Sequence, residues 1–307
     1  MAILLVKLTG LPESWTMPLM VVFGFGFCIT AFIGYRGLEV LSRFAVPAMI
    51  ILVAVSMTIA GSDAGGLAGL MSITPSEDMT VAAAITLVFG TFVSGGTQAT
   101  NWTRFARSGK TAVIATLLAF FLGNGLMTLI GAFGALVYQQ ADIVDIMVAQ
   151  GLATLGILML FLNLWTTQDN TVYNFAVAGC NLLRTRRRKL VTVGGAAIGT
   201  VLAVLGMYEW LIPFLVLLGT FIPPIGGVIM ASYFVGYKRE YPALDQVSLP
   251  AFNVPGLAAY AIGSVVAYTS PWIAPIVGVV VAAGSYGLLL LVADSVRERR
   301  AQTSGAA

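Results

Sequence analysis

Long apolar stretches separated by short polar connections run through the whole sequence. They indicate whether the folded chain is surrounded by water or by lipid. Of its 307 residues, 58% are hydrophobic and only 9% are charged, whereas soluble domains carry about 25% charged residues. A stretch of about 20 apolar residues crosses a bilayer as a helix. The sequence therefore predicts an all-α integral membrane protein. The expected spans are residues 15–35, 45–61, 79–103, 111–137, 152–183, 190–208, 210–236, 253–269 and 271–294.

The basic residues set the expected orientation of these nine spans. Fifteen of the sixteen Lys and Arg fall in alternate connections or in the tail, and the intervening connections contain none. Short loops rich in Lys and Arg stay on the cytoplasmic side of the membrane. We therefore expect the tail, residues 295–307, to be cytoplasmic and Trp15 to begin outside. The run from Arg184 to Lys189 is then a topology signal with lipid headgroups as neighbours, and we expect no binding of nucleic acid.

Missing residue types exclude several classes of chemistry. The sequence contains no histidine, which removes His-based general acid–base catalysis, Ser-His-Asp triads and histidine metal sites. Its two cysteines, Cys28 and Cys180, lie in apolar segments without a CxxC partner, so buried free thiols are expected. No catalytic constellation remains, and we predict that the chain is not an enzyme.

The polar run from Asn163 to Thr171 is the most costly part of this apolar sequence. Residues 152–183 are long enough to cross a bilayer, so the run falls near the middle of the membrane. Amides, hydroxyls and carboxylates cost free energy there unless they face a partner, a cavity or an ion. Asp169 is the only acid well inside a span. It is either a proton carrier or a carboxylate held by helix amides or hydroxyls, and the sequence leaves both open.

A second polar span covers residues 86–105. Gly95 and Gly96 lie at its centre beside Ser94 and Thr97, and each glycine weakens a helix by about 1 kcal/mol relative to alanine. We predict an unwound segment at these glycines, because transporters build ligand sites near the midplane from unwound backbone that faces a cavity. The alternative is a contact between helices through small residues, without a ligand. Two polar spans in one chain favour the site.

Gapless motifs in collinear order carry a resemblance to a known family. They include Phe92-Val-Ser-Gly-Gly-Thr-Gln-Ala-Thr-Asn-Trp-Thr-Arg-Phe-Ala-Arg-Ser-Gly-Lys110, Asn163-Leu-Trp-Thr-Thr-Gln-Asp-Asn170 and Ile222-Pro-Pro-Ile-Gly-Gly-Val228. From about Met1 to Asp294 the chain resembles the nucleobase:cation symporter-1 family, also called the purine-cytosine permease family, and within it the bacterial cytosine permeases most. The resemblance implies an inverted-repeat, LeuT-like transporter fold with twelve helices, of which about nine are present here.

The same resemblance implies the organisation of a single transmembrane domain, residues 1–307. The implied parts are 1–11 as the end of family helix three, 15–61 as helices four and five, 79–236 as the second five-helix repeat, and 253–294 as the last two helices. Helices one, two and most of three would then be missing, which makes a truncated, non-transporting remnant one alternative.

Carried over by position, the family's binding residues fall in the two polar spans. Phe92 would stack on the face of a pyrimidine, and the backbone around Ser94 and Gly95 would meet its polar edge. Asn163 would hydrogen-bond the base or help to hold the ion, and Thr166 and Thr167 would offer hydroxyl oxygens to sodium. Residues three and four apart share one helix face, which suits this assignment.

The resemblance implies a secondary active transporter that imports cytosine or a related nucleobase by symport with Na+ or H+. Its expected location is the bacterial cytoplasmic (inner) membrane, in contact with the lipid bilayer, and its oligomeric state stays open. The alternative substrates are a purine, a hydantoin, allantoin or an amino acid. One departure concerns Asn101, which stands where the family usually has an acid before Arg-Phe, so the resemblance implies that Arg104 is controlled differently here. A competition experiment with unlabelled compounds separates the substrates.

Overall fold

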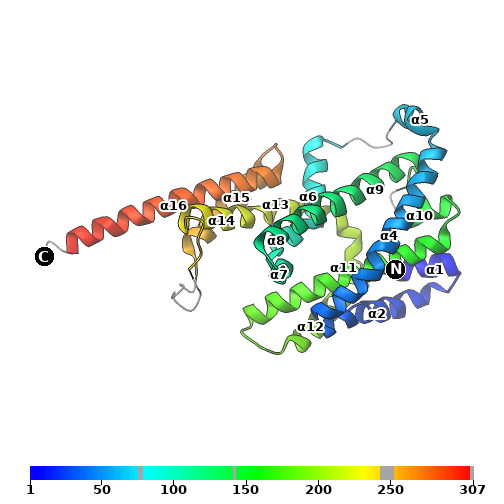
Figure 1. Cartoon of the computed structure of the whole chain (residues 1–307), viewed down its shortest axis with the longest axis horizontal. Helices are drawn as coiled ribbons and strands as arrows, with labels where there is room; N and C mark the ends of the chain where they lie inside the picture. Colours follow the sequence, from blue (N-terminus) through cyan, green and yellow to red (C-terminus); the bar gives the residue numbers. More distant parts are fainter. Residues whose placement is uncertain (75–78, 141–142, 243–251, 305–307) are drawn as a thin grey trace. The chain divides into compact units, whose positions relative to one another are not determined.

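The structure, a computed structural model, describes residues 1–74, 79–140, 143–242 and 252–304 (Figure 1). Every regular element in this part of the chain is a helix, which confirms the predicted all-α class. The contacts divide the chain into two compact units, each described below by itself. Unit 1 comprises Met1–Asp78 with Asn101–Glu209, and unit 2 comprises Met79–Thr100 with Trp210–Ala307.

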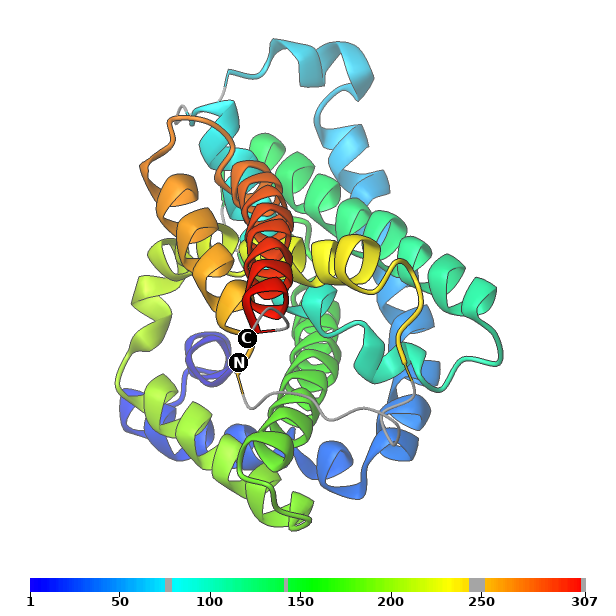
Figure 2. The same cartoon turned by 90° about the vertical axis from the view of Figure 1, so that its left-hand side faces the viewer.

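Unit 1 is formed by the N-terminal helices and by those in the middle of the chain. Its helices are α1 (Ala2–Thr9), α2 (Thr16–Gly26), α3 (Ile29–Ile33), α4 (Tyr35–Asp63), α5 (Gly66–Ser72), α7 (Thr100–Thr103, which begins at the unit border), α8 (Gly109–Leu118), α9 (Gly125–Tyr138), α10 (Ile143–Ala149), α11 (Ala153–Leu182) and α12 (Arg188–Val204). A π-helical turn at Ala119–Asn124 joins α8 to α9. The longest of these helices, α11, runs without a break (Figure 2). The polar run lies at its centre.

Two buried clusters hold α11 within unit 1. Near one end, Val172 and Tyr173 of α11 pack with Cys28 and Ala31 around the break between α2 and α3. Towards the other end, Met159 packs with residues of α4, α9 and α10; this second cluster comprises Leu52, Val53, Ile130, Met147 and Met159. The polar run of α11 therefore lies on a helix that is fixed on both sides of it.

The span predicted at 15–35 is not one continuous helix. The structure ends α2 at Gly26 and begins α3 at Ile29. The amide of Cys28 donates to the carbonyl oxygen of Phe25 rather than to that of Gly24. This tighter turn leaves the Gly24 carbonyl without its usual helical donor, and the break faces α11.

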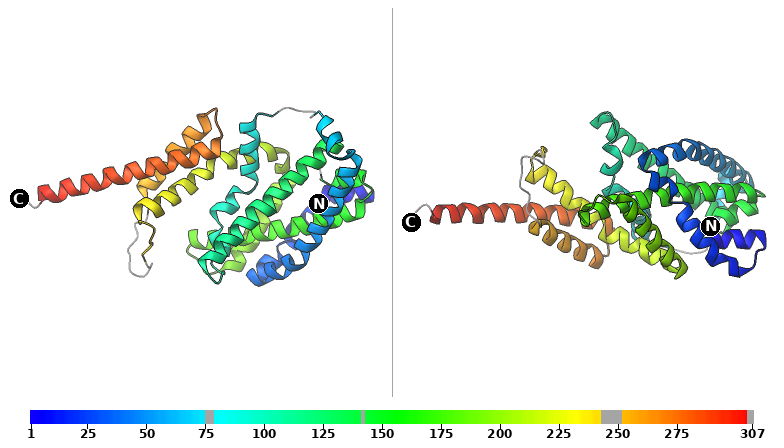
Figure 3. Two further views of the ribbon diagram at one scale, coloured as in Figure 1. Left: turned by 45° about the horizontal axis from the view of Figure 1, so that its top comes forward. Right: turned by 90° about the horizontal axis from the view of Figure 1, so that it is seen from below.

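Unit 2 is formed by α6 and by the C-terminal helices. Its helices are α6 (Val81–Thr97), α13 (Leu211–Phe221), α14 (Pro223–Ala231), α15 (Val254–Thr269) and α16 (Ala274–Ser304). Helices α15 and α16 run side by side (Figure 3), and Tyr286 packs with Ala231 and Ala259 in a small buried core. Because proline lacks an amide donor and suits the first turn, Pro223 and Pro224 begin α14 and end α13.

Close backbone contacts hold the helices of unit 2 together. A Cβ atom at Gly90 of α6 would lie 2.0 Å from the carbonyl oxygen of Leu215 in α13. A Cβ atom at Gly227 of α14 would lie 2.4 Å from the carbonyl oxygen of Val279 in α16. Neither position has room for a larger residue. Helix association in lipid depends on such small residues, because lipid tails are as apolar as the side chains.

Helices cover all nine predicted spans, and in the part of the chain that the structure describes six helical segments are long and apolar enough to cross a membrane by themselves. These six are Glu13–Ile33, Tyr35–Asp63, Val81–Thr103, Gly109–Tyr138, Met207–Gly236 and Ala274–Val292. Of the other three, α12 and α15 are shorter, with 17 and 16 residues. Helix α11 is long enough, with 30 residues, but its polar run lowers its hydropathy.

Candidate functional site

The six residues predicted to bind substrate or ion fall on two helices, three on each. Those on α11 in unit 1 are Asn163, Thr166 and Thr167; those on α6 in unit 2 are Phe92, Ser94 and Gly95. Within each helix the structure brings its three residues onto one or two adjacent turns. The two groups are described separately, as halves of the predicted site.

The polar face of α11 combines one hydroxyl that is directed onto its own helix with two side chains that have no hydrogen-bond partner in the described residues. The Thr166 hydroxyl donates to the carbonyl oxygens of Leu162 and Asn163, each at 3.0 Å. This back-bonding is common for threonine in helices, and it uses the proton of Thr166 Oγ1 while leaving the oxygen able to accept. Thr167 is exposed, and neither its hydroxyl nor the side-chain amide of Asn163 has a hydrogen-bond partner in the described residues. The face therefore offers oxygen acceptors and one amide to a ligand.

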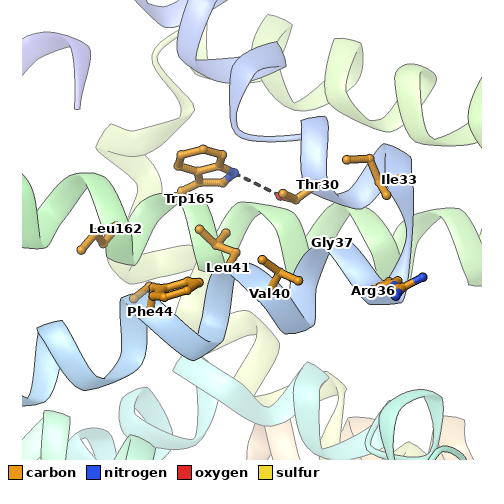
Figure 4. A pocket seen from close by; sticks show the side chains of 10 residues that line it. Thr30, Ile33, Arg36, Gly37, Val40, Leu41, Phe44, Leu162 and Trp165 are labelled. Carbon is orange, nitrogen blue, oxygen red and sulfur yellow. Dashed lines mark hydrogen bonds between the residues drawn. The ribbon is translucent and has the colours of Figure 1, made fainter.

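The opposite face of α11 holds the broken helix of unit 1. The Gln168 amide donates to the Gly24 carbonyl oxygen at 2.6 Å, which is the acceptor that the break leaves without a helical donor. One turn before, Trp165 Nε1 donates to Thr30 Oγ1 at 3.1 Å (Figure 4). The sequence singled out neither of these roles. The spacing of Trp165 and Gln168 on one face was a visible signal, but their acceptors lie about 140 residues away in the chain.

Asp169 is the buried acid of this face. Its side chain is 1% exposed, and neither carboxylate oxygen has a hydrogen bond of normal geometry among the described residues, although Thr30 and the amide of Ala31 lie beside it. Its neighbours are thus a hydroxyl and a helix amide. Its function stays open, as the sequence left it.

We predict that Asp169→Asn stabilises the protein. A buried ionised carboxylate without good hydrogen bonds is destabilising, and asparagine keeps its shape without its charge. The free energy of unfolding should rise by about 1–3 kcal/mol, the cost of one unsatisfied buried polar group. The measurement is thermal unfolding of the purified protein in detergent, with Asn174→Asp as the reverse change at another buried position of α11. A lower melting temperature for Asp169→Asn would show that Thr30 and Ala31 hold the charged form well.

The α6 half is helical where an unwound segment was predicted. Helix α6 continues through Gly95 and Gly96, and the interruption falls at Gln98 and Ala99. The predicted position was therefore wrong by two to three residues. Helical hydrogen bonding persists because the Ser94 carbonyl oxygen accepts from the Gln98 amide at 3.1 Å, so the two glycines alone do not unwind the helix.

Phe92 and Gly95 form one contact within this half. A Cβ atom at Gly95 would lie 2.7 Å from Cε1 of the Phe92 ring. The ring thus lies against Gly95, and a side chain at this position would displace it. Phe92 remains 44% exposed, and an exposed aromatic face is the surface on which a planar ring stacks.

Beyond the interruption, uncharged partners tie the chain to α11. Asn101 Nδ2 donates to Asn174 Oδ1 at 3.1 Å, and Arg104 Nη2 donates to the Tyr173 hydroxyl at 3.0 Å. All four residues belong to unit 1. Asn101 therefore makes a neutral amide–amide contact.

The donor set of α11 fits an alkali cation better than a transition metal. The described residues contain no group of three or more His, Cys, Asp or Glu that could hold a metal ion. Hydroxyl and carbonyl oxygens are hard ligands, which suit alkali and alkaline-earth cations. The face of Asn163, Thr166 and Thr167 supplies ligands of this kind from one helix only.

Apolar helices of membrane length define a multi-pass membrane protein, with polar residues at the centre of α11 and in the last turns of α6. The solved structure of Mhp1 supports this class: it is described as a nucleobase-cation-symport-1 family transporter in a closed conformation with bromovinylhydantoin bound. It matches 95% of this chain and 70% of its own chain, with a TM-score of 0.74 at 20% sequence identity. This likeness shows the fold.

The family follows from the sequence comparison. The family model described as "Permease for cytosine/purines, uracil, thiamine, allantoin" matches residues 2–289, so the chain belongs to this family. Cytosine permeases from Escherichia coli O157:H7 and from Escherichia coli strain K12 are each 38% identical to it over 283 residues, which are 92% of this chain and 66% of each relative. The chain thus spans just under two thirds of the length of these relatives. The relatives are permeases, which confirms both the resemblance and the prediction that the chain is not an enzyme.

Proposed function

We propose that the chain acts in the import of cytosine, or a closely related nucleobase, coupled to entry of a cation. The membrane is the bacterial cytoplasmic membrane, with the C-terminal tail on the cytoplasmic side. The observation that supports this most is the polar face of Asn163, Thr166 and Thr167, on an otherwise apolar helix of a chain that is 38% identical to cytosine permeases. Polar groups inside a membrane cost free energy, and binding of a ligand accounts for the presence of this polar face.

The α6 half would select the base. A nucleobase is small, planar and uncharged, so stacking and a few hydrogen bonds are its available means of recognition. The Phe92 ring would supply the stacking surface, and the backbone around Ser94 and Gly95 would meet the polar edge of the base. The free amide of Asn163 on α11 would add a donor and an acceptor.

The α11 half would hold the coupling cation. Sodium bound through Thr166 and Thr167 would stabilise the conformation that binds substrate. Because coupling between two ligands is reciprocal, the base would raise the affinity for sodium by the same factor. A proton is the alternative coupling ion.

Uptake of radiolabelled cytosine by cells that express this chain tests the proposal. Uptake should exceed that of empty-vector cells and should fall when the sodium gradient is collapsed with an ionophore. A proton ionophore in sodium-free medium separates the two cations. Uptake that needs neither gradient would overturn the proposed symport.

We predict that Thr167→Val raises the sodium concentration needed for half-maximal cytosine binding. Valine keeps the shape of threonine and removes the oxygen, and a bond to a charged group contributes about 1.5 kcal/mol or more, which corresponds to about tenfold or more. The matched control is Thr171→Val one turn further on, because the Thr171 hydroxyl already donates to the Thr167 carbonyl oxygen at 2.9 Å. Binding is measured at several sodium concentrations. Equal shifts in both variants would remove Thr167 from the ion site.

The same site also suits other small planar rings. The family description includes purines, uracil, thiamine and allantoin, and the Mhp1 structure contains a hydantoin. Competition of these unlabelled compounds against labelled cytosine decides among them. Stronger competition by a hydantoin than by unlabelled cytosine would identify a hydantoin as the preferred substrate. The assignments of the fold and the site would stay the same.

A further inference from the structure

A groove of about 490 Å³ lies in unit 1 between α3, α4 and α11 (Figure 4). Its lining is Thr30, Ile33, Arg36, Gly37, Val40, Leu41, Phe44, Ala45, Leu162 and Trp165. Almost all of these side chains are apolar, and the one charged residue, Arg36, lies in the first turn of α4. Trp165 lies on a different face of α11 from Thr167, whereas Leu162 lies one turn before Thr166, so the groove borders the proposed ion site on one side.

The groove follows the axis of α4. Arg36, Val40 and Phe44 are spaced four residues apart and therefore lie in a row on one face. At a rise of 1.5 Å per residue this row is about 12 Å long. Val40 and Phe44 are 52% and 76% exposed. Exposed apolar residues alone are ordinary in lipid, but here they line a hollow with a cation at one end.

The charges at the Arg36 end favour an anion. The guanidinium of Arg188 lies at the same end, where it donates to the carbonyl oxygens of Phe32 and Ile33 at 3.4 and 3.3 Å. The nearest acid on α4, Glu39, is paired with Arg43 at 2.5 Å, and the first turn of α4 contains no acid. Asp169 lies behind Thr30, is 1% exposed and does not line the groove.

We propose that this groove binds one anionic phospholipid. Its phosphate pairs with Arg36, and one acyl chain lies along Val40 and Phe44 against Leu162 and Trp165. The position of the charge agrees with the expected orientation, because Arg36 belongs to a connection rich in basic residues, where lipid headgroups lie.

The charge distribution favours a phospholipid as the occupant. The groove is apolar along its length with a single cation, Arg36, at one end, and a phospholipid carries one anionic group beside an apolar chain.

Native mass spectrometry of the purified chain tests this proposal, with dioleoylphosphatidylglycerol as the anionic probe and dioleoylphosphatidylcholine as its zwitterionic counterpart. The wild-type chain should bind the anionic lipid more tightly. Arg36→Gln should weaken its binding about fivefold, the effect of one basic residue near a membrane surface. Arg43→Gln is the matched control, since Arg43 lies on the same helix, is paired with Glu39 and lies outside the groove. Val40→Trp, at an exposed position, should fill the groove and weaken binding while Arg36 is intact.

Several results would overturn the proposal. One is equal binding of the two lipids, and another is an equal loss in Arg36→Gln and Arg43→Gln, which would indicate a diffuse surface charge. Normal binding in Val40→Trp would exclude the acyl chain from the groove. A dimer that Val40→Trp abolishes would make a second copy the occupant. Should a variant fail to fold, photolabelling of the wild-type chain with a phosphatidylglycerol whose acyl chain carries a diazirine decides the matter, because labelled peptides should contain Val40 or Phe44.

Discussion

Gly227→Ala is expected to destabilise the protein strongly, whereas the same change at the adjacent Gly226 is expected to be neutral or stabilising. A Cβ atom at Gly227 would lie 2.4 Å from the Val279 carbonyl oxygen, and one at Gly226 would meet nothing within 4 Å. The obstacle at Gly227 is backbone, so α14 and α16 would have to separate. Overpacking of this kind costs about 3 kcal/mol, while alanine in a helix gains about 1 kcal/mol over glycine.

The measurement is thermal unfolding of both variants in the same detergent, followed by circular dichroism. Because the two residues share a helix and a substitution, differences in helix propensity cancel between them. A melting temperature that falls equally in both variants, or in neither, would contradict the packing of α14 against α16. The run Pro223-Pro224-Ile-Gly-Gly227 then has two roles: its prolines begin α14, and Gly227 is the point at which α14 touches α16.

Asn163→Ala is expected to weaken cytosine binding about 10- to 100-fold. The Asn163 amide is half-buried and makes no hydrogen bond within the described residues, so its donors and acceptor are available to a ligand. Removing a hydrogen-bond partner from a buried polar group of the base leaves that group unsatisfied, at a cost of about 1–3 kcal/mol. The measurement is equilibrium binding of labelled cytosine to the purified protein at saturating sodium.

Asn170→Ala is the matched control for this experiment. Asn170 lies two turns further along the same helix, and its amide already donates to the Thr166 carbonyl oxygen at 3.0 Å. Its loss should therefore change binding much less. Unchanged binding in Asn163→Ala would remove this residue from the site, and an equal loss in both variants would indicate a general disturbance of α11.

Much of the fold could be predicted from hydropathy, because in lipid a backbone must satisfy its own hydrogen bonds and a long apolar stretch has only the helix available. The breaks within the helices were harder to predict. The glycines at 95 and 96 weaken α6 locally, but the helix continues to Thr97 and the interruption follows at Gln98. The break at Phe27 and Cys28 has no proline, and the Gly24 carbonyl oxygen that it leaves without a helical donor accepts instead from the Gln168 amide of α11. Helix propensity depends on neighbouring residues alone, so it cannot predict a break that a residue of another helix stabilises.

The candidate site was predictable in part for the same reason. The cost of polar groups in lipid identifies the run from Asn163 to Thr171 from sequence alone, and helical spacing separates its two faces. The sequence did not show which face of α11 packs against other helices. That assignment required the structure, because Gln168 and Trp165 bond residues of α2 and α3 that are far away in sequence. The site assignment on Asn163, Thr166 and Thr167 stays a prediction.

The neutral partners of Arg104 and Asn101 have a consequence for the response of the protein to salt. Contacts between opposite charges weaken as dissolved ions screen them over about 10 Å at 0.1 M. Here Arg104 meets a phenol hydroxyl and Asn101 meets an amide, so neither contact depends on a full negative charge. The attachment of this segment to α11 should therefore keep its strength as the ionic strength of the adjoining water changes, which a carboxylate at position 101 would not allow.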